Sequence, residues 1–261
     1  MAADQLSIPG NPFYARDDIA ERYNRSRALP GDVEREWSDL LAIHVGITSG
    51  LSVDVGCGTG RFTRILVSTF RRRVIGIDPS LPMLRSAATS VGLMPGVLLV
   101  RGRAEALPLA PRCADLVLMS MSYHHVVDKP AALASVRNTL RAGGAFCVRT
   151  CSVEALDSYL YQRFFPAARR LDERRFPTRD GLVAEVSAAR FALRKFETVR
   201  QRVADDLATY YDRVKLRAHS DLQAVPDGEF SEGVREFGAW VADQPERPVY
   251  EDVDLFTFTA V

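Results

Sequence analysis

The chain has 261 residues, of which 47% are hydrophobic and 26% are charged, and its formal net charge is +1. These values are typical of one globular α/β domain with additions, or at most two domains. The small net charge provides no global field for nucleic acid or an anionic membrane, and no apolar run approaches the ~18 residues of a membrane span. We therefore expect no nucleic-acid or membrane partner. A monomer or homodimer is expected.

The amino terminus and the cysteines indicate a cytoplasmic protein. The first residues lack the basic region and following apolar stretch of a secretory signal. None of the cysteines belongs to a C-x-x-C pair, so we predict free thiols in a reducing compartment and no metal site. The cysteines are Cys57, Cys113, Cys147 and Cys151.

Two helices are predicted before the first strand. The first extends from Phe13 to about Arg27, and the second begins at about Asp32, after a break at Pro30-Gly31. The apolar residues of both segments repeat at helical spacing, while residues 1–12 are polar and contain two prolines. These helices are not expected to belong to a sheet.

A glycine-rich turn follows the first predicted strand, Leu51–Val55. Gly56, Gly58 and Gly60 alternate with other residues, and the apolar positions after them repeat at helical spacing. A turn of this kind lets the backbone approach a ligand and directs the N–H groups of the helix start toward it. The third glycine stands one residue earlier than in the dinucleotide fingerprint, so a nicotinamide cofactor is disfavoured.

The second predicted strand, residues 74–78, ends in an acidic residue, Asp78. A doubly wound fold places the carboxyl end of this strand beside the glycine turn. A carboxylate there can accept hydrogen bonds from both hydroxyl groups of a ribose. The sequence therefore predicts a nucleoside-type ligand at this edge of the sheet.

Two histidines follow the predicted fourth strand, Asp115–Ser120. The carboxyl ends of strands in open α/β sheets are where ligands bind, and imidazole has a suitable pKa for accepting a proton near neutral pH. We therefore regard His124 and His125 as candidate catalytic bases, without choosing between them. Asp128 is predicted to cap the next helix.

The segment Val53–Gly60 resembles the first motif of the class I S-adenosylmethionine (SAM) dependent methyltransferases, in their type 11-like, small-molecule branch. Three further features occur in the order typical of that family. They are Asp78-Pro79-Ser80 before a methionine, the loop Ala104-Glu105-Ala106-Leu107-Pro108, and the turn Gly143-Gly144. The resemblance is firm over residues 48–150 and weak elsewhere.

The resemblance implies a doubly wound, mostly parallel sheet of seven strands, with the last strand antiparallel and inserted beside the sixth. It also implies three regions: a helical lid at residues 1–47, a SAM-binding Rossmann-like core at 48–150, and a substrate-facing region at 151–261. In that last region we expect a helical insertion over 151–176, a helix after Thr178, a strand over 191–203, helices over 205–218 and 229–242, and a final strand over 253–259.

The cofactor implied by the resemblance is SAM. Asp54 and the glycine turn would position its amino-acid end, Asp78 its ribose, and Pro79 with Met83 its adenine. Ala104 and Glu105 would contact the adenine edge, although Arg103 stands where the family often has an aspartate. The full set of expected cofactor contacts is Asp54, Gly56, Cys57, Gly58, Gly60, Asp78, Pro79, Met83, Ala104, Glu105 and Ser120, with Tyr23 and Arg27 from the lid.

The implied reaction is methyl transfer to an oxygen, nitrogen or carbon nucleophile of a small molecule, in bacterial secondary metabolism. The motif that grips the amino group of a nucleic-acid base is absent after the fourth strand, where Met121-Ser122-Tyr123 stands. Candidate substrate contacts farther along the chain are Tyr210, Tyr211, Arg213, Arg217 and His219. Two alternatives remain open: a non-methylating enzyme such as a cyclase that binds SAM or its product structurally, and a regulatory protein with a degenerate pocket.

Overall fold

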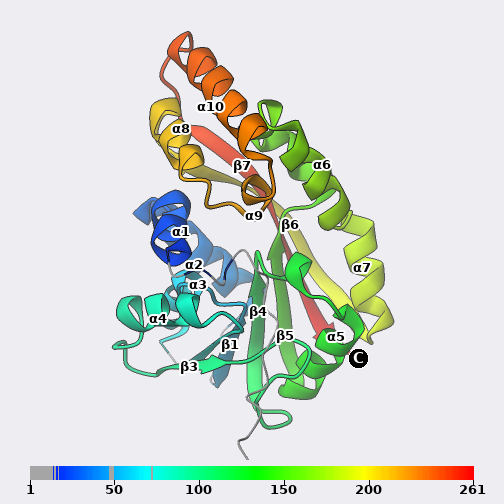
Figure 1. Cartoon of the computed structure of the whole chain (residues 1–261). Helices are drawn as coiled ribbons and strands as arrows, with labels where there is room; N and C mark the ends of the chain where they lie inside the picture. Colours follow the sequence, from blue (N-terminus) through cyan, green and yellow to red (C-terminus); the bar gives the residue numbers. More distant parts are fainter. Residues whose placement is uncertain (1–13, 15, 17, 47–49, 72) are drawn as a thin grey trace, which may run out of the picture.

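The computed structural model describes residues 14, 16, 18–46, 50–71 and 73–261, and Figure 1 shows how they are arranged. Two helices precede the first strand, α1 at Ile19–Arg27 and α2 at Gly31–Val45. Both agree with the predicted helices, although α1 is shorter than expected. Phe13 and the polar start of the chain lie outside the described residues.

The sheet confirms the predicted seven-stranded topology. Its order is β3-β2-β1-β4-β5-β7-β6; the first five strands pair in parallel, and β7 is antiparallel to both of its neighbours. The order reverses between β1 and β4, so a crevice forms at their carboxyl ends. The strands are β1 Leu51–Val55, β2 Val74–Asp78, β3 Val97–Arg101, β4 Ala114–Ser120, β5 Leu140–Thr150, β6 Phe191–Ala204 and β7 Val249–Ala260.

Helices cover both faces of the sheet because alternate residues of each strand point to opposite sides. In β4, Leu116 and Leu118 pack in a buried cluster with α2 and α3, whereas Val117 and Met119 pack in another with α5 and α7. The remaining flanking helices are α3 Arg61–Phe70, α4 Leu81–Ser90, α5 Lys129–Thr139 and α7 Arg179–Ala188. Asp128 caps α5 as predicted, accepting a hydrogen bond from the Ala131 N–H at 3.0 Å.

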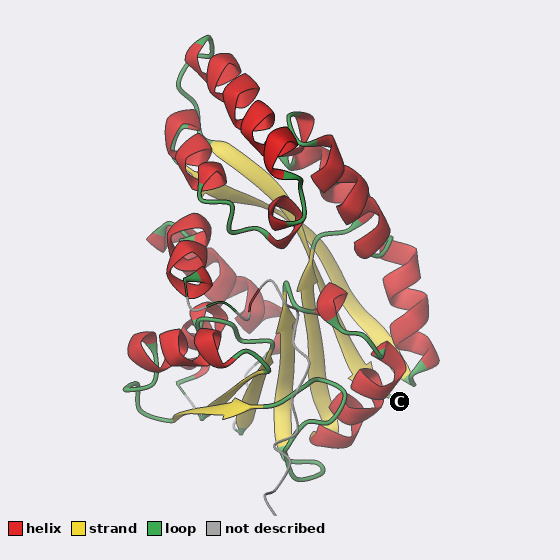
Figure 2. Cartoon of the chain, viewed as in Figure 1, coloured by secondary structure: helices red, strands yellow, loops and turns green. Residues whose placement is uncertain are grey.

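The last two strands are longer than the others and reach into a separate helical region. Figures 1 and 2 show β6 and β7 running past the parallel strands to where α6, α8, α9 and α10 gather. This upper region has its own buried cluster, which includes Leu156, Phe165 and Phe237. Its helices are α6 Pro166–Arg175, α8 Leu207–Lys215, α9 Ser220–Gln223 and α10 Asp227–Ala242.

Three local predictions need correction. The insertion after β5 begins as 3₁₀ turns, η3 Val153–Ser158 and η4 Leu160–Arg163, and only its last part forms α6. The short helix α9 is not anticipated by the sequence pattern. The residues predicted as a Gly-Gly turn belong to β5, because Leu140 already pairs with Ala114 before a register shift carries the chain through Gly143 at a φ of +75°.

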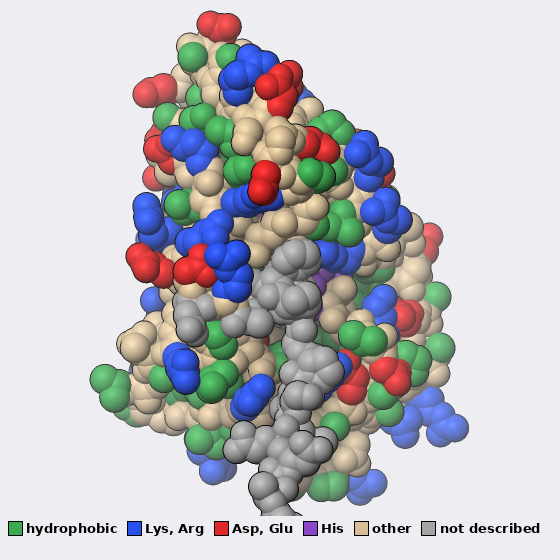
Figure 3. All heavy atoms as spheres, viewed as in Figure 1, with side chains coloured by type: hydrophobic (Ala, Val, Ile, Leu, Met, Phe, Trp, Pro, Cys, Tyr) green, Lys and Arg blue, Asp and Glu red, His purple; other side chains and the backbone are tan. Residues whose placement is uncertain are grey.

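Surface character agrees with the small net charge. Figure 3 shows basic and acidic side chains interspersed over one face of the molecule. None of the described helices is both long enough and apolar enough to cross a membrane.

Candidate active site

The glycine turn after β1 is held in a conformation that only glycine adopts easily. Gly56 has a φ of +74°, and a Cβ there would stand 2.4 Å from the Cβ of Ser122. The N–H groups of Gly56 and Cys57 both donate to the Ile77 carbonyl, at 2.7 and 3.0 Å. The turn is therefore fixed to the end of β2, and its backbone forms one wall of a cavity.

A cavity of about 580 Å³ opens at the carboxyl ends of β1, β2 and β4, and we call it the main cavity. Most of the predicted cofactor contacts lie on its wall. They are Tyr23, Asp54, Gly56, Cys57, Gly58, Asp78, Pro79, Met83, Ala104, Glu105 and Ser120, and His124 and His125 join them.

Asp54 presents a buried carboxylate oxygen without a partner. Its Oδ2 accepts a hydrogen bond from the Thr63 hydroxyl at 2.7 Å, but its Oδ1 has no hydrogen-bond partner among the residues described. Burial raises the pKa of Asp54 to about 7, the Thr63 hydrogen bond opposes this shift, and the neighbouring Asp78 adds to it. A buried oxygen of this kind suits a ligand that brings its own N–H donors, such as an ammonium group.

Asp78 links the glycine turn to the start of α4. One carboxylate oxygen accepts the Gly58 N–H and the other the Ser80 N–H, both at 2.8 Å. Burial raises the pKa of Asp78 to about 6, while these two hydrogen bonds oppose the shift. Each oxygen keeps a second lone pair, so the carboxylate can still accept from two vicinal hydroxyl groups.

Glu105 is held by its arginine neighbour. Nε and Nη2 of Arg103 each lie 3.3 Å from a Glu105 carboxylate oxygen, and the Val127 N–H also donates to that carboxylate at 3.3 Å. Partial burial raises the pKa of Glu105, but the hydrogen bonds and charge of Arg103 together with backbone N–H donors outweigh it, so the pKa is lowered. The arginine that departs from the family pattern thus orients Glu105 on the cavity wall.

Two predicted cofactor contacts lie off the main cavity. Gly60 starts α3 with a φ of +88°, and a Cβ there would stand 2.7 Å from Val91, so its role is in packing the turn against α4. Arg27 lines an adjoining chamber instead, where its guanidinium lies 3.7 Å from Glu251. Tyr23, from the same helix, does face the main cavity.

The two candidate bases are neutral imidazoles. Their ring centroids lie 4.0 Å apart, and Nδ1 of His124 is buried without a hydrogen-bond partner in the described structure. Burial lowers the pKa of His125 to about 3 and that of His124 well below 6.5, and nearby positive charges, including Arg175, add to both shifts. Either ring can accept a proton at neutral pH, but each is a weak base.

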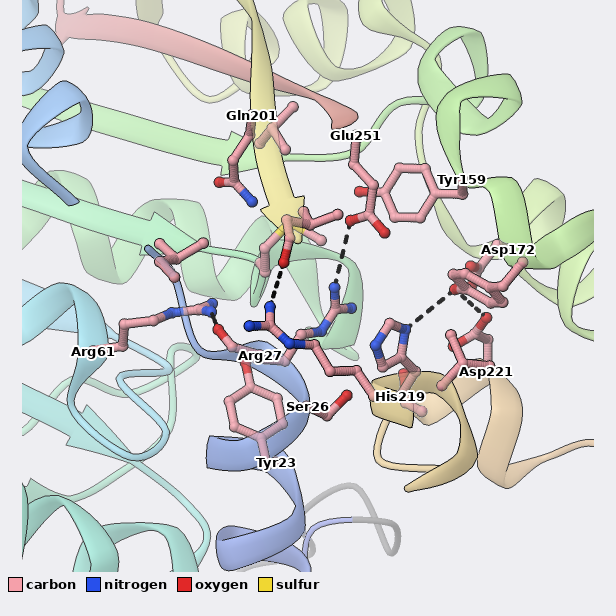
Figure 4. Close-up of a pocket in the computed structure, with 18 of the residues that line it drawn as sticks. Tyr23, Ser26, Arg27, Arg61, Tyr159, Asp172, Gln201, His219, Asp221 and Glu251 are labelled. Carbon is pink, nitrogen blue, oxygen red and sulfur yellow. Dashed lines mark hydrogen bonds and ion pairs between the residues drawn. The ribbon is translucent and has the colours of Figure 1, made fainter. Parts of the chain in front are cut away.

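A smaller, more polar cavity of about 60 Å³ adjoins the main one, and we call it the inner chamber (Figure 4). It lies between α1, the ends of β5, β6 and β7, and the helices of the upper region. The residues that line both cavities are Tyr14, Tyr23, Arg61, Met121, His124 and His125. An acceptor in the chamber would therefore lie beside the main cavity.

The chamber has a basic side and an acidic side. Figure 4 shows Arg27 and Arg61 on one side and Asp172 and Asp221 on the other. On the acidic side, Tyr161 donates to Asp221 at 2.7 Å and also lies 3.3 Å from His219.

The chamber brings together some of the candidate substrate contacts of the carboxyl-terminal half and leaves others outside it. Tyr210, Arg213 and His219 line it as expected, whereas Tyr211 packs against Phe237 and Arg217 pairs with Asp227. The sequence reading missed other chamber residues, namely Arg149, Asp172, Gln201, Asp221 and Glu251. One signal in the sequence could have identified Arg149: it directly follows the apolar run Phe146-Cys147-Val148. Charged residues are rarely buried in a strand unless they have a partner or a function.

Comparison with known proteins agrees with this geometry. Residues 53–148 match a family model described as a methyltransferase domain. Over 136 residues the chain is 28% identical to the ubiquinone/menaquinone biosynthesis C-methyltransferase UbiE of Syntrophotalea carbinolica, covering 51% of this chain and 57% of that protein. Over 159 residues it is 33% identical to the malonyl-acyl-carrier-protein O-methyltransferase of Pseudescherichia vulneris, covering 60% and 61%.

The fold has solved counterparts as well. The crystal structure of the cyclase SpnF superposes with a TM-score of 0.61 at 18% identity, covering 90% of this chain and 84% of that one. The matches to the two methyltransferases span less than two thirds of either relative's length. Residues 53–148 thus form a methyltransferase domain of the class I SAM-dependent type.

Proposed function

We propose that this chain transfers the methyl group of SAM to a small molecule that enters the inner chamber. The observation that carries the proposal is the adjacency of the two cavities, one lined by the glycine turn and Asp78, the other with several charged and polar residues in its lining. SAM supplies an activated methyl group and its own leaving group, so the protein mainly has to align donor and acceptor. We expect the acceptor to be a bacterial secondary metabolite and the protein to be cytoplasmic.

The residues of the main cavity suit the parts of SAM in a consistent order. The buried Oδ1 of Asp54 would accept from the ammonium group, and the carboxylate of Asp78 would accept from the ribose hydroxyls. Met83, packed with Ile19 and Ala20 of α1, would contact the adenine with Pro79, while Ala104 and Glu105 would face its edge. In this proposal, residues 1–47 act as a lid, 48–150 bind SAM and 151–261 select the acceptor.

The histidines fit an acceptor that needs little help from a base. Methyl transfer requires proton removal only when the nucleophile still carries its proton. A weak, neutral imidazole can assist only a nucleophile whose proton is already acidic. We propose His124 as the proton acceptor, because its buried Nδ1 has no hydrogen-bond partner in the described structure.

Binding is the first test. Calorimetry of ligand-free protein with SAM, S-adenosylhomocysteine (SAH) and NAD should show binding of the two sulfur ligands and none of NAD. Asp78→Asn should weaken SAH by about tenfold to a hundredfold, since two hydrogen bonds to a charged group are lost. Asp243→Asn, at an exposed position of the same chain, is the matched control and should bind as wild type does. Wild-type protein that is folded but binds neither SAM nor SAH would overturn the proposal.

A second function is kept because of one comparison. A structural neighbour that covers 90% of this chain is named a cyclase, and a cyclase on this scaffold could bind SAM without consuming it. Release of SAH in proportion to product identifies methyl transfer, whereas product formation without SAH release identifies the alternative. Once an acceptor is known, His124→Gln should lower kcat while leaving SAH affinity unchanged.

A further inference from the structure

We propose that the acceptor carries a carboxylate group as a recognition element, and that the inner chamber holds this carboxylate on Arg149 beside Arg61. This inference rests on the proposed function, because it assigns the substrate class of the same site. It depends on a buried positive charge that forms no ion pair with a carboxylate in the described part of the protein, although the charge of Glu251 acts on it.

Arg149 is a buried arginine with donors to spare. Its side chain is 2% exposed, although it is one of the residues that line the chamber. Its guanidinium donates to Ser120 and to the Oε1 of Gln201, but its Nε has no hydrogen-bond partner in the structure as described. No carboxylate of the described residues forms an ion pair with it. An arginine that is buried without a carboxylate partner destabilises the folded protein unless a ligand supplies the missing negative charge and hydrogen-bond acceptors.

The plane of this guanidinium is fixed by aromatic rings. The Arg149 Cζ lies 4.4 Å from the centre of the Trp37 ring and 4.6 Å from that of Phe62. The Trp37 indole also donates to the same Gln201 oxygen, at 2.8 Å, which sets the orientation of that amide. A rigid, planar fork of N–H donors matches a carboxylate, which accepts two parallel hydrogen bonds.

Arg61 adds a second positive charge, and no described carboxylate lies within ion-pair distance of it, although the charges of Glu34 and Asp54 act on it. Its guanidinium donates to the Arg27 carbonyl, and its Nε has no partner in the described structure. The side chain lines both the chamber and the main cavity. Burial first, and the charge of Arg61 second, lower the pKa of Arg149 to about 9.

The acids of the chamber are engaged elsewhere. Glu251 accepts from Tyr210 at 2.9 Å and lies 3.7 Å from Arg27. Asp172 accepts from Gln162 at 2.8 Å and lies 3.8 Å from Arg175.

Burial, reinforced by Asp221, raises the pKa of Asp172 to about 8. Arg61 and Arg27 act on Arg149 against Glu251, so positive charge predominates at the Arg149 side of the chamber. An anionic acceptor would neutralise it.

The cofactor's own carboxylate is the competing occupant, and the geometry disfavours it at Arg149. Arg149 lines the inner chamber but not the main cavity, while Tyr23 and Arg61 border the main cavity directly. A comparison of SAH with methylthioadenosine, which lacks the amino-acid end, separates the two roles. If Arg149 serves the acceptor, its replacement should leave the affinity ratio of these two ligands unchanged.

The experiment uses full-length protein saturated with SAH and two pairs of probes, acetate with acetamide and benzoate with benzamide. Calorimetry should show at least tenfold tighter binding of each carboxylate than of its amide. Arg149→Gln should abolish this preference, and Arg149→Lys, which keeps the charge but not the planar fork, should reduce it several-fold. Arg194→Gln, an exposed arginine of β6, is the control and should retain the preference.

The outcomes separate the two proposals. If wild-type protein does not bind SAH, the proposed function fails and the carboxylate inference fails with it. If SAH binds but wild-type protein does not prefer the carboxylates, the inference alone is overturned, whatever the variants do. It is also overturned if the preference survives in Arg149→Gln, or if that variant changes the ratio of SAH to methylthioadenosine affinity.

Discussion

At the scale of single residues, the site is built from two buried carboxylates at the ends of neighbouring strands. Asp54 and Asp78 both have a raised pKa, about 7 and about 6, because burial penalises their charged forms. In the unfolded chain both groups return to ordinary values near 3.8. The ligand-free protein therefore holds these protons more tightly when folded than when unfolded, over the range between about pH 4 and pH 7.

This difference predicts how stability depends on pH. Since the folded state binds more protons there, the contribution of Asp54 to stability is present at low pH and is lost as pH rises through about 7. Asp54→Asn removes that dependence. Urea unfolding of both proteins at pH 5, 6, 7 and 8, without ligand, should show wild type losing stability relative to the variant as pH rises. If the free energy of unfolding depends on pH in the same way in both proteins, the raised pKa of Asp54 is contradicted.

Glycine substitutions in the turn should differ in severity. Gly56→Ala brings a Cβ to 2.4 Å from Ser122 at a φ of +74°, whereas at Gly58 the φ is +55° and an added Cβ would meet no atom within 4 Å. We expect Gly56→Ala to lower the free energy of unfolding by more than about 1–3 kcal/mol, because a steric clash adds to backbone strain. Gly58→Ala should cost less. Ligand-free denaturation measures both, and equal losses would show that the clash with Ser122 is relieved.

At the scale of elements, helix α1 is fastened to the upper region as well as to the main cavity. The Arg22 guanidinium donates to the carbonyl of Leu216 at 2.5 and 2.9 Å and to that of Arg217 at 3.2 Å. Ile19 and Ala20 of the same helix pack against Met83 at the start of α4. The helix therefore spans the opening between the two halves of the site.

Loosening this attachment should affect binding without unfolding the protein. Arg22→Gln leaves the Leu216 carbonyl without its charged donor, so we expect faster amide hydrogen exchange in α1 and SAH dissociation several-fold faster. Arg25→Gln, at an exposed position of the same helix, should change neither quantity. Exchange measured by mass spectrometry, together with stopped-flow dissociation, tests both variants. Unchanged dissociation in Arg22→Gln would argue against a lid role for α1.

The elements were predictable to different degrees for identifiable reasons. The range of β2 was predicted directly, because a short apolar run ends at Asp78. The range of β1 was predicted in the same way, because its apolar run stops where the glycine turn begins at Gly56. The 3₁₀ turns after Thr150 were not predicted, because their apolar residues are spaced as in a helix. The main cavity followed from the strand order, since adjacent parallel strands bring their carboxyl ends together.

The inner chamber could not be predicted because strand register determines it. Gln201 and Glu251 face each other as paired residues of β6 and β7, although they lie far apart in the sequence. Asp172 and Asp221 then approach from α6 and α9. No local pattern specifies which of several in-phase registers two long antiparallel strands adopt, so these residues looked like ordinary sheet and helix positions.

At the scale of the whole molecule, two long strands join the parallel sheet to the upper region. Val253 and Leu255 of β7 belong to the cluster beneath α2, whereas Val249 of the same strand belongs to the cluster of the upper region. We therefore expect the two regions to unfold as one cooperative unit.

The two tryptophans report on this cooperativity separately. Trp37 is fully buried beside the sheet, and Trp240 packs in the upper region. In Trp37→Phe only the upper region fluoresces, and in Trp240→Phe only the sheet does. Within each variant, the unfolding midpoint measured by tryptophan fluorescence should coincide with the midpoint measured by circular dichroism. Separate midpoints would show that the upper region unfolds independently.

The ends of β6 and β7 that project past the parallel strands have a consequence for how the inner chamber can be changed. Gln201 and Glu251 sit on the strand ends that project past the parallel sheet, while the glycine turn sits on β1 at the centre of it. Substitutions on these projecting ends can reshape the inner chamber without disturbing the contacts that hold the glycine turn to Ile77 and Asp78. If the chamber binds the methyl acceptor, as proposed, acceptor preference can be redesigned by exchanging the projecting strand ends and their helices together, with the glycine turn and Asp78 unchanged.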